Sequence, residues 1–452
     1  MKINIITLGC SKNTVDSENL ASGLSAQGHT VYFDSQRKDC DAIIVNTCGF
    51  IGDAKEESIN TILQQIALKT RGRKARKLIA CGCLVERYKE ELAQEMPEVD
   101  AWYGVHEWDK IVQCLNADAS DTQAIKQSNN QAISRPLSTP SHYAYLKIAE
   151  GCNRSCSYCA IPLIRGAHKS IPIDELVAEA KALVAKGVKE LIVISQDTTF
   201  YGLDLYHRRA LGELLDRLAE ESGAEWIRLH YTYPASFPDD ALDAIARHPN
   251  ICKYIDIPLQ HINTRILTSM QRGIDREGTL RLLARFREKL PTAAVRTTLI
   301  VGYPGETEAD FEELKDFVRQ ARFDRMGCFA YSPEEGTPAE PLGDPVPDEE
   351  KQRRVSELMA IQEEISLEKN QERIGKVFRC LVDRIEDEYI VARTEYDSPE
   401  VDDEVLIPIP AAANSQFPIL NPQLPKPGDF ISVRITDATE HDIYGEIDVK
   451  NN

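Results

Sequence analysis

The deciding stretch of this sequence is Gly151-Cys152-Asn153-Arg154-Ser155-Cys156-Ser157-Tyr158-Cys159, in which three cysteines stand four and then three positions apart. Iron–sulfur clusters are held by cysteine thiolates, normally four for each cubane. A site with three thiolates leaves one iron open to another ligand. A structural zinc site supplies four ligands, and His168 is the only histidine close downstream. The spacing therefore indicates an iron–sulfur site, with zinc or three buried structural cysteines as the weaker alternatives.

The spacing Cys152-x3-Cys156-x2-Cys159, with Tyr158 before the last cysteine, resembles the cluster loop of radical S-adenosylmethionine enzymes. The resemblance implies a 4Fe-4S cluster whose open iron chelates the amino and carboxylate groups of S-adenosylmethionine. It also implies that one electron splits the sulfonium to give a 5′-deoxyadenosyl radical. The motif identifies a radical generator and leaves its substrate open.

The composition is that of an ordinary globular protein, with 452 residues of which 42% are hydrophobic and 28% charged. No apolar run reaches the length of a transmembrane helix, so we expect a cytoplasmic protein without a membrane partner. The twelve cysteines are clustered, which favours metal or redox use in a reducing compartment over disulfides. A net charge of −19 is unlike that of most nucleic-acid binders and fits a basic protein partner better.

Residues 1–115 alternate strand-like and helical patterns, which predicts a doubly wound parallel α/β domain. Ligands of such sheets bind beyond the carboxyl ends of the strands. Cys10, Cys48 and Cys83 each follow an expected strand and precede an expected helix, where free N–H groups and the helix dipole favour an anionic ligand. The expected strands are Ile3–Leu8, Thr30–Phe33, Asp41–Asn46, Lys77–Ala80 and Ala101–Tyr103.

These three cysteines predict a second cluster with an open iron, and chance placement of structural cysteines is the alternative. Cys81 is ambiguous because it lies two residues from Cys83. We interpret the other cysteines as structural: Cys40, Cys114, Cys252, Cys328 and Cys380.

Three segments, Leu8–Asn13, Asn46–Phe50 and Gly82–Leu84, resemble the amino-terminal domain of the methylthiotransferases. The resemblance implies that Cys10, Cys48 and Cys83 hold an auxiliary 4Fe-4S cluster whose open iron carries the inserted sulfur. The first segment, continued by Val15–Glu18, is closest to the branch that acts on a ribosomal protein, the RimO family.

Residues 116–137 are rich in Asn, Ser, Ala and Gln and are interpreted as a linker. Residues 138–370 predict six β/α units, which form a partial (β/α)6 TIM-like barrel open on one side. Barrel chemistry occurs at the carboxyl ends of the strands. The expected strands are Tyr143–Ala149, Glu190–Ser195, Trp226–His230, Tyr254–Ile257, Val295–Val301 and Met326–Tyr331.

The ends of these strands resemble segments that line the S-adenosylmethionine pocket of the family. The glycine turn at residues 301–307 is equally consistent with a plain loop, and His261 with a structural histidine or a base. Because the radical removes a hydrogen atom, no single catalytic side chain is assigned. The implied cofactor-binding residues are Tyr158, Gln196, Asp197, Thr198, Arg228, Gln260, Gly302 and Gly305.

Residues 371–443 contain short strands and Pro-rich turns, which predict a small OB-like β-barrel followed by a tail at 444–452. This part resembles the TRAM module of the family. Residues 371–452 carry 17 Asp and Glu against 8 Lys and Arg, a net charge of −9 that repels phosphate and would attract a basic ribosomal protein. The segment Arg393–Asp402 resembles the ribosomal-protein branch, while a solvated acidic surface without a partner is the alternative.

The resemblance spans nearly the whole chain and implies a radical methylthiotransferase of the RimO family. The implied reaction replaces a β C–H of an aspartate, in the small-subunit ribosomal protein at the decoding centre, by C–SCH3. It uses two 4Fe-4S clusters, with S-adenosylmethionine as both methyl donor and radical source. A sulfur donor and an external electron donor are further partners, and we expect a monomer whose substrate is not nucleic acid. The alternatives are a tRNA adenosine methylthiotransferase and a non-catalytic iron–sulfur scaffold.

Overall fold

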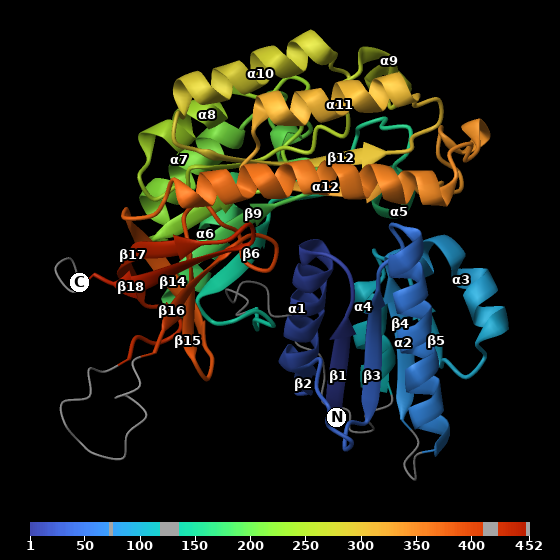
Figure 1. The fold of residues 1–452 in the computed structure, drawn as a ribbon. Coiled ribbons are helices and arrows are strands. Elements are labelled where there is room, and N and C mark those ends of the chain that lie inside the picture. Colours follow the sequence, from blue (N-terminus) through green and yellow to red (C-terminus); the bar gives the residue numbers. More distant parts are fainter. Residues whose placement is uncertain (72–75, 118–134, 410–423, 449–452) are drawn as a thin grey trace.

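The computed structural model describes residues 1–71, 76–117, 135–409 and 424–448. These residues form an α/β layer structure, a half-barrel and a small closed β-barrel in chain order (Figure 1). The predicted fold class is therefore confirmed. Most of the predicted linker lies outside the described residues. Within the described ranges, no helix combines the length and the apolar character that a membrane span needs.

The first part is a parallel sheet with the strand order β2-β1-β3-β4-β5. Its central strand β3 is buried along its whole length because helices cover both faces of the sheet. Helices α1 (Ser11–Ala26) and α4 (Trp108–Ala117) pack on one face, and α2 (Gly52–Arg71) and α3 (Cys83–Glu95) on the other. The strands are β1 (Lys2–Thr7), β2 (Thr30–Phe33), β3 (Ala42–Thr47), β4 (Lys77–Gly82) and β5 (Ala101–Tyr103).

The central part consists of two parallel three-stranded sheets that continue into each other. A parallel bridge between Ile227 and Ile251 joins the two sheets, as does the N–H of Thr232, which donates to the carbonyl of Asp256 at 3.1 Å. The result is the open half-barrel that the sequence predicted. Its strands are β6 (Tyr143–Lys147), β9 (Glu190–Ile194), β10 (Trp226–Leu229), β11 (Tyr254–Asp256), β12 (Ala294–Val301) and β13 (Arg325–Ala330).

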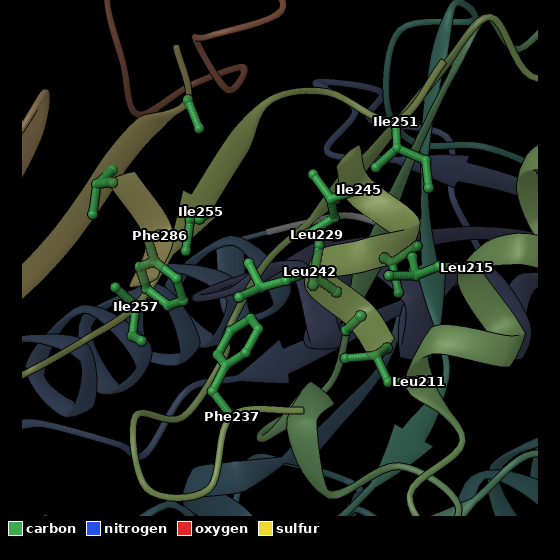
Figure 2. Close-up of a cluster of buried hydrophobic side chains, with 14 of the residues drawn as sticks. Leu211, Leu215, Leu229, Phe237, Leu242, Ile245, Ile251, Ile255, Ile257 and Phe286 are labelled. Carbon is green, nitrogen blue, oxygen red and sulfur yellow. The ribbon is translucent and has the colours of Figure 1, made fainter. Parts of the chain in front are cut away.

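Helices cover the outer side of the half-barrel and form the largest apolar core with it. Alternate strand residues such as Leu229 and Ile255 point outward to this core, where they meet helix residues such as Leu242 and Phe286 (Figure 2). The alternation follows the two-residue period of a strand. The covering helices are α6 (Ile173–Ala185), α7 (Leu211–Glu221), α8 (Asp239–Arg247), α10 (Arg276–Lys289), α11 (Glu308–Ala321) and α12 (Asp348–Gln371).

The last part is a closed barrel with the strand order β14-β15-β16-β18-β17. Its interior is apolar, with residues such as Val382, Val405 and Val433. Strand β18 continues to Ile447, so the barrel extends past residue 443, where the sequence analysis ended it. The strands are β14 (Val377–Ile385), β15 (Tyr389–Thr394), β16 (Glu404–Pro408), β17 (Phe430–Ala438) and β18 (Asp442–Ile447).

The connection between β15 and β16, residues 395–403, inserts into the amino end of the half-barrel, and we call it the plug loop. Arg325 donates to Asp397 at 2.5 Å, and Tyr254 donates to Asp402 at 2.6 Å. Glu400 of the same loop accepts from the hydroxyl groups of Tyr143 and Tyr145. Asp397 and Asp402 are buried. The expected charge available to a basic partner included Asp397 and Asp402, and the structure corrects this, because both carboxylates are used inside the protein.

Glu190 anchors the same interface from the side of the half-barrel. Its fully buried carboxylate accepts from Arg228 Nε at 2.7 Å and also pairs with Arg393 of β15. Burial alone would raise the pKa of Glu190, but the two guanidinium groups outweigh it and hold that pKa at about 2. Glu190 thus links two buried cations from two domains, and Arg393 pairs with Asp383 as well.

We predict that Glu190→Ala destabilises the protein far more than Glu225→Ala. Both carboxylates join the half-barrel to the last barrel, but Glu225 is 35% exposed and pairs with Lys189 and Arg379. Loss of Glu190 leaves the buried Arg228 without its carboxylate partner and removes one of the two carboxylates that pair with Arg393, which should cost about 3–5 kcal/mol of unfolding free energy. Loss of the exposed pair should cost less than about 1 kcal/mol. Urea denaturation followed by tryptophan fluorescence measures both, and equal losses would contradict the prediction.

Candidate functional site

The carboxyl edge of the first sheet brings together the three cysteine loops that the sequence placed there. Cys10 precedes α1, Cys48 follows β3, and Cys83 begins α3. Gly49 allows two of these loops to touch, because a Cβ at this position would lie 2.7 Å from the backbone of Leu84. Strand order reverses between β1 and β3, and such a switch point is where doubly wound sheets bind ligands.

The three thiols are close enough to influence one another. Burial raises the pKa of Cys83 to about 12, Arg165 opposes this shift, and the neighbouring Cys10 and Cys48 raise the pKa further. A buried thiol of this kind keeps its proton until a metal takes the proton's place. Cys81, by contrast, packs in the apolar cluster between the sheet and helices α1 and α4. Its side chain therefore belongs to the core of the sheet.

Arg165 crosses from the central domain to this edge. It ends the short helix α5 (Ile161–Arg165), and its Nη2 lies 3.3 Å from Cys83 Sγ and 2.6 Å from Asn13 Oδ1. Its Nη1 donates to Asp16 of α1 at 2.8 Å and to Glu150 at 3.0 Å. One buried guanidinium thus contacts a cysteine of the first triad and the residue before the cluster loop of the second.

The second cysteine loop follows the short strand β7 (Ala149–Glu150) and precedes α5, and β7 pairs with β8 (Lys169–Ser170), which comes after α5. Gly151 is required at its start, because its φ is +77° and a Cβ there would lie 2.3 Å from the carbonyl oxygen of Ala167. Burial raises the pKa of Cys152 to about 11 and that of Cys159 to about 12, and nearby Cys156 contributes to both shifts. The predicted triad of Cys152, Cys156 and Cys159 therefore occupies one site.

Two arginines and a tyrosine surround this triad. Arg272 Nη1 lies 3.3 Å from Cys156 Sγ and 3.2 Å from the hydroxyl of Tyr158. The ring of Tyr233 lies 4.3 Å from the Arg272 guanidinium and 3.9 Å from that of Arg154. A buried cation beside thiol ligands compensates the negative charge that thiolates bring, as Arg165 does at the first triad.

Several predicted cofactor-binding residues surround the same loop. Asp197 accepts from Arg154 Nε at 2.6 Å, and Gln196 donates to Glu150 at 2.7 Å. Thr198 donates to the backbone carbonyl of His230. Among the described residues, the buried side-chain oxygens of Gln196 and Gln260 have no hydrogen-bond partner. Such open acceptors fit a ligand that carries an amino group, as S-adenosylmethionine does.

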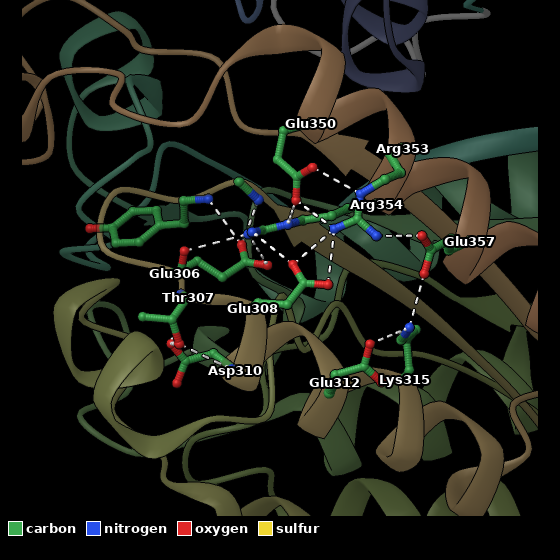
Figure 3. Close-up of polar contacts among 12 residues, drawn as sticks. Glu306, Thr307, Glu308, Asp310, Glu312, Lys315, Glu350, Arg353, Arg354 and Glu357 are labelled. Atoms are coloured by element: carbon green, nitrogen blue, oxygen red, sulfur yellow. Dashed lines mark hydrogen bonds and ion pairs between the residues drawn. The ribbon is translucent and has the colours of Figure 1, made fainter.

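The glycine turn after β12 is held in place from outside by α12. Gly302 has a φ of +74°, and a Cβ there would lie 2.4 Å from the side chain of Lys351. Its N–H donates to Glu306 at 2.5 Å, and Glu306 in turn pairs with Arg354 of α12 at 3.1 Å (Figure 3). Gly305 accepts from an arginine side chain through its carbonyl. The turn is therefore rigidly positioned at the carboxyl end of its strand.

Arg228 of the predicted set, and His261, which the sequence left open between a structural role and that of a base, have different surroundings. Arg228 is fully buried at the interface with the last barrel, where it contacts Glu190 and the carbonyl of Glu395. His261 accepts from the N–H of Asn263, and burial lowers its pKa to about 3, so its ring is neutral near pH 7. A structural role suits both side chains better than a role at the reacting centre.

Some residues that contact the cysteines were not predicted from the sequence. Asn13 stands within the quoted segment Leu8–Asn13 and Arg165 lies six positions after Cys159, so both were near a recognised motif. Tyr233 and Arg272 carry no local signal, because only the barrel fold brings them to the cluster loop. No group of three or more His, Cys, Asp or Glu side chains in the described residues is placed to hold a single metal ion.

Comparison with family models divides the chain as the fold does. Residues 146–318 match the radical SAM superfamily, residues 2–104 match the uncharacterized protein family UPF0004, and residues 374–447 match the TRAM domain.

Two solved structures share the fold. The radical S-adenosylmethionine methyltransferase TsrM from Kitasatospora setae aligns with a TM-score of 0.54 and 13% identity, over 75% of this chain and 74% of its own. The cobalamin-dependent radical enzyme OxsB aligns with a TM-score of 0.51 and 12% identity, over 80% and 56%.

Relatives of much higher identity match over almost the full length. The ribosomal protein uS12 methylthiotransferase RimO of Flavobacterium johnsoniae is 52% identical over 446 residues, covering 98% of both chains. The protein of the same name from Phocaeicola vulgatus is 50% identical, covering 98% of this chain and 99% of its own. Matches of this extent span all three domains, and the chain belongs to the family of the ribosomal protein uS12 methylthiotransferase RimO.

Proposed function

We propose that this protein is a radical S-adenosylmethionine enzyme that inserts a methylthio group into ribosomal protein uS12. The proposed reaction replaces the β C–H of an aspartate by C–SCH3. The observation that carries the proposal is the pairing of two cysteine triads through one buried arginine. Arg165 contacts Cys83 of the first triad and, through Glu150, the start of the loop that contains the second. The RimO relatives supply the identity of the substrate protein.

Cys152, Cys156 and Cys159 would hold the 4Fe-4S cluster of the radical site, and Cys10, Cys48 and Cys83 an auxiliary 4Fe-4S cluster. When bound, these clusters and S-adenosylmethionine supply the radical, the methyl group and the site for sulfur, which protein side chains do not provide. Around them, the free oxygens of Gln196 and Gln260 would accept hydrogen bonds from the amino group of S-adenosylmethionine. Arg272 and Arg165 would each donate to one ligating thiolate.

The remaining partners follow from the chemistry. Insertion of sulfur needs a sulfur donor, and cleavage of S-adenosylmethionine needs an external one-electron donor. In this proposal the substrate is a protein and not a tRNA. We propose that the enzyme works as a monomer, because the two triads that the reaction requires lie within one chain.

We predict that removal of either cysteine triad lowers the iron content equally but affects the two products differently. Replacing Cys152, Cys156 and Cys159 by Ala should leave about half of the iron and abolish 5′-deoxyadenosine formation, because three thiolates hold each cluster. Replacing Cys10, Cys48 and Cys83 should also leave about half of the iron, but 5′-deoxyadenosine should still form without methylthiolated product. Iron analysis and product chromatography on reconstituted protein measure these outcomes.

The matched control is the double variant Cys252→Ala/Cys380→Ala, which removes two buried thiols of other sites and should keep all iron. Complete loss of iron from either folded triple variant would contradict the two-cluster proposal. Absence of 5′-deoxyadenosine from the intact, reduced enzyme would contradict the radical activity itself.

We further predict that cells lacking this gene contain uS12 lighter by about 46 Da, the mass of the CH2S added when a hydrogen is replaced by SCH3. Mass spectrometry of the isolated ribosomal protein measures the difference, and tandem fragmentation locates it on an aspartate. The tRNA of the same cells serves as the control and should be unchanged. Loss of a methylthio group from tRNA with unaltered uS12 would overturn the choice of substrate.

A further inference from the structure

Among the hydrogen bonds of the described residues, that of Arg165 is the one by which a side chain of the central domain reaches a cysteine of the first domain. Its side chain is almost fully buried, so all of its donors must be used within the protein. It contacts Cys83 Sγ at 3.3 Å and Asn13 Oδ1 at 2.6 Å through one nitrogen, and Asp16 and Glu150 through another. No sequence motif assigned a role to it.

The charges around Arg165 balance as a set of four. Asp16 and Glu150 are the carboxylates, and Arg165 and Lys147 are the cations, with Lys147 contacting both carboxylates. The four side chains come from both domains, since Asp16 lies on α1 and the other three lie in the half-barrel. Of the two cations, only Arg165 also contacts a cysteine. Comparing Arg165 with Lys147 therefore separates an effect on the cysteine site from an effect on the joint between the domains.

We infer that Arg165 is a positioning residue that sets the reduction potential of the auxiliary site through its contact with Cys83, in addition to joining the two domains. The inference rests on the proposed function, because it requires a cluster at Cys10, Cys48 and Cys83. Hydrogen bonds to the sulfur ligands and nearby charge are principal determinants of the potential of an iron–sulfur cluster. A buried guanidinium that donates to a ligating sulfur provides both, in a region where water does not screen the charge.

A purely structural role would give a different pattern. If Arg165 only joined the domains, Lys147 would be its equivalent, since it pairs with the same two carboxylates. Lys147→Gln is therefore the matched control. It removes one buried cation from the same set while leaving the contact between Arg165 and Cys83 in place. Arg165→Lys is the conservative variant, which keeps the charge but loses the planar fork of donors.

The experiment uses the full chain with Cys152, Cys156 and Cys159 replaced by Ala, so that only the auxiliary cluster contributes to the spectrum. The reconstituted protein is titrated with a reductant, and the cluster is followed by electron paramagnetic resonance. Arg165→Gln should shift the reduction potential to a more negative value, because a cation and an N–H···S contact no longer stabilise the added electron. Arg165→Lys should restore part of the shift, and Lys147→Gln should leave the potential close to that of the parent.

In the enzyme with both triads intact, Arg165→Gln should still form 5′-deoxyadenosine, while methylthiolated product falls about tenfold or more, as for other residues that support metal ligands. An unchanged potential in Arg165→Gln, or an equal shift in Lys147→Gln, overturns the inference and leaves the proposed function standing. If Arg165→Gln does not fold, a potential in Arg165→Lys equal to that of the parent overturns it. Absence of any auxiliary cluster in the parent protein overturns the inference together with the two-cluster proposal.

Discussion

The contact on which the arrangement of the two cysteine sites depends is the largely buried ion-pair set that joins Asp16 of the first domain to Arg165, Lys147 and Glu150 of the half-barrel. Separately, each domain places three cysteines at the carboxyl ends of its strands, as parallel α/β folds commonly do with functional residues. The set fixes one edge against the other, since Arg165 contacts Cys83 while Glu150 precedes Gly151. Removing a partner from such a buried set is costly, so the relative position of the two triads is well defined.

A second ion-pair contact holds the same two parts together further along the chain. Glu334, in the segment after β13, is buried and accepts from both Lys55 of α2 and Arg87 of α3 at 2.6 Å. Ion pairs thus hold the first domain to the half-barrel at places that are far apart in sequence. Ion pairs at separate places restrict rotation of the first domain against the half-barrel, whereas a single contact would allow the two parts to hinge. This restriction suits a reaction in which two sites must act on one substrate atom.

The sequence predicted what depends on local periodicity and spacing. The five strands of the first sheet and the six strands of the half-barrel lie close to the expected ranges, because apolar runs alternate with helical patterns along the chain. The cysteine triads were found because their spacing and their places after strands are local features. Arg272 and Tyr233 were missed because they reach Cys156 from distant barrel segments, and the partners of Arg228 depend on a domain that lies far along the chain. Such pairings are decided by tertiary packing, which no short window of sequence contains.

The acidic residues of the last domain led us to expect a basic protein partner, but several of them form contacts within the protein. Its plug loop contacts Tyr143, Tyr254 and Arg325, the first residues of strands β6, β11 and β13. These contacts close the amino end of the half-barrel and engage carboxylates that had been expected, from the sequence, to face a basic partner. The cluster loop lies at the opposite, carboxyl end, which faces the first domain. Asp397 and Asp402 of the plug loop are thus paired inside the protein, whereas both triads lie at the carboxyl end, and we expect the proposed protein substrate to reach the triads from that end.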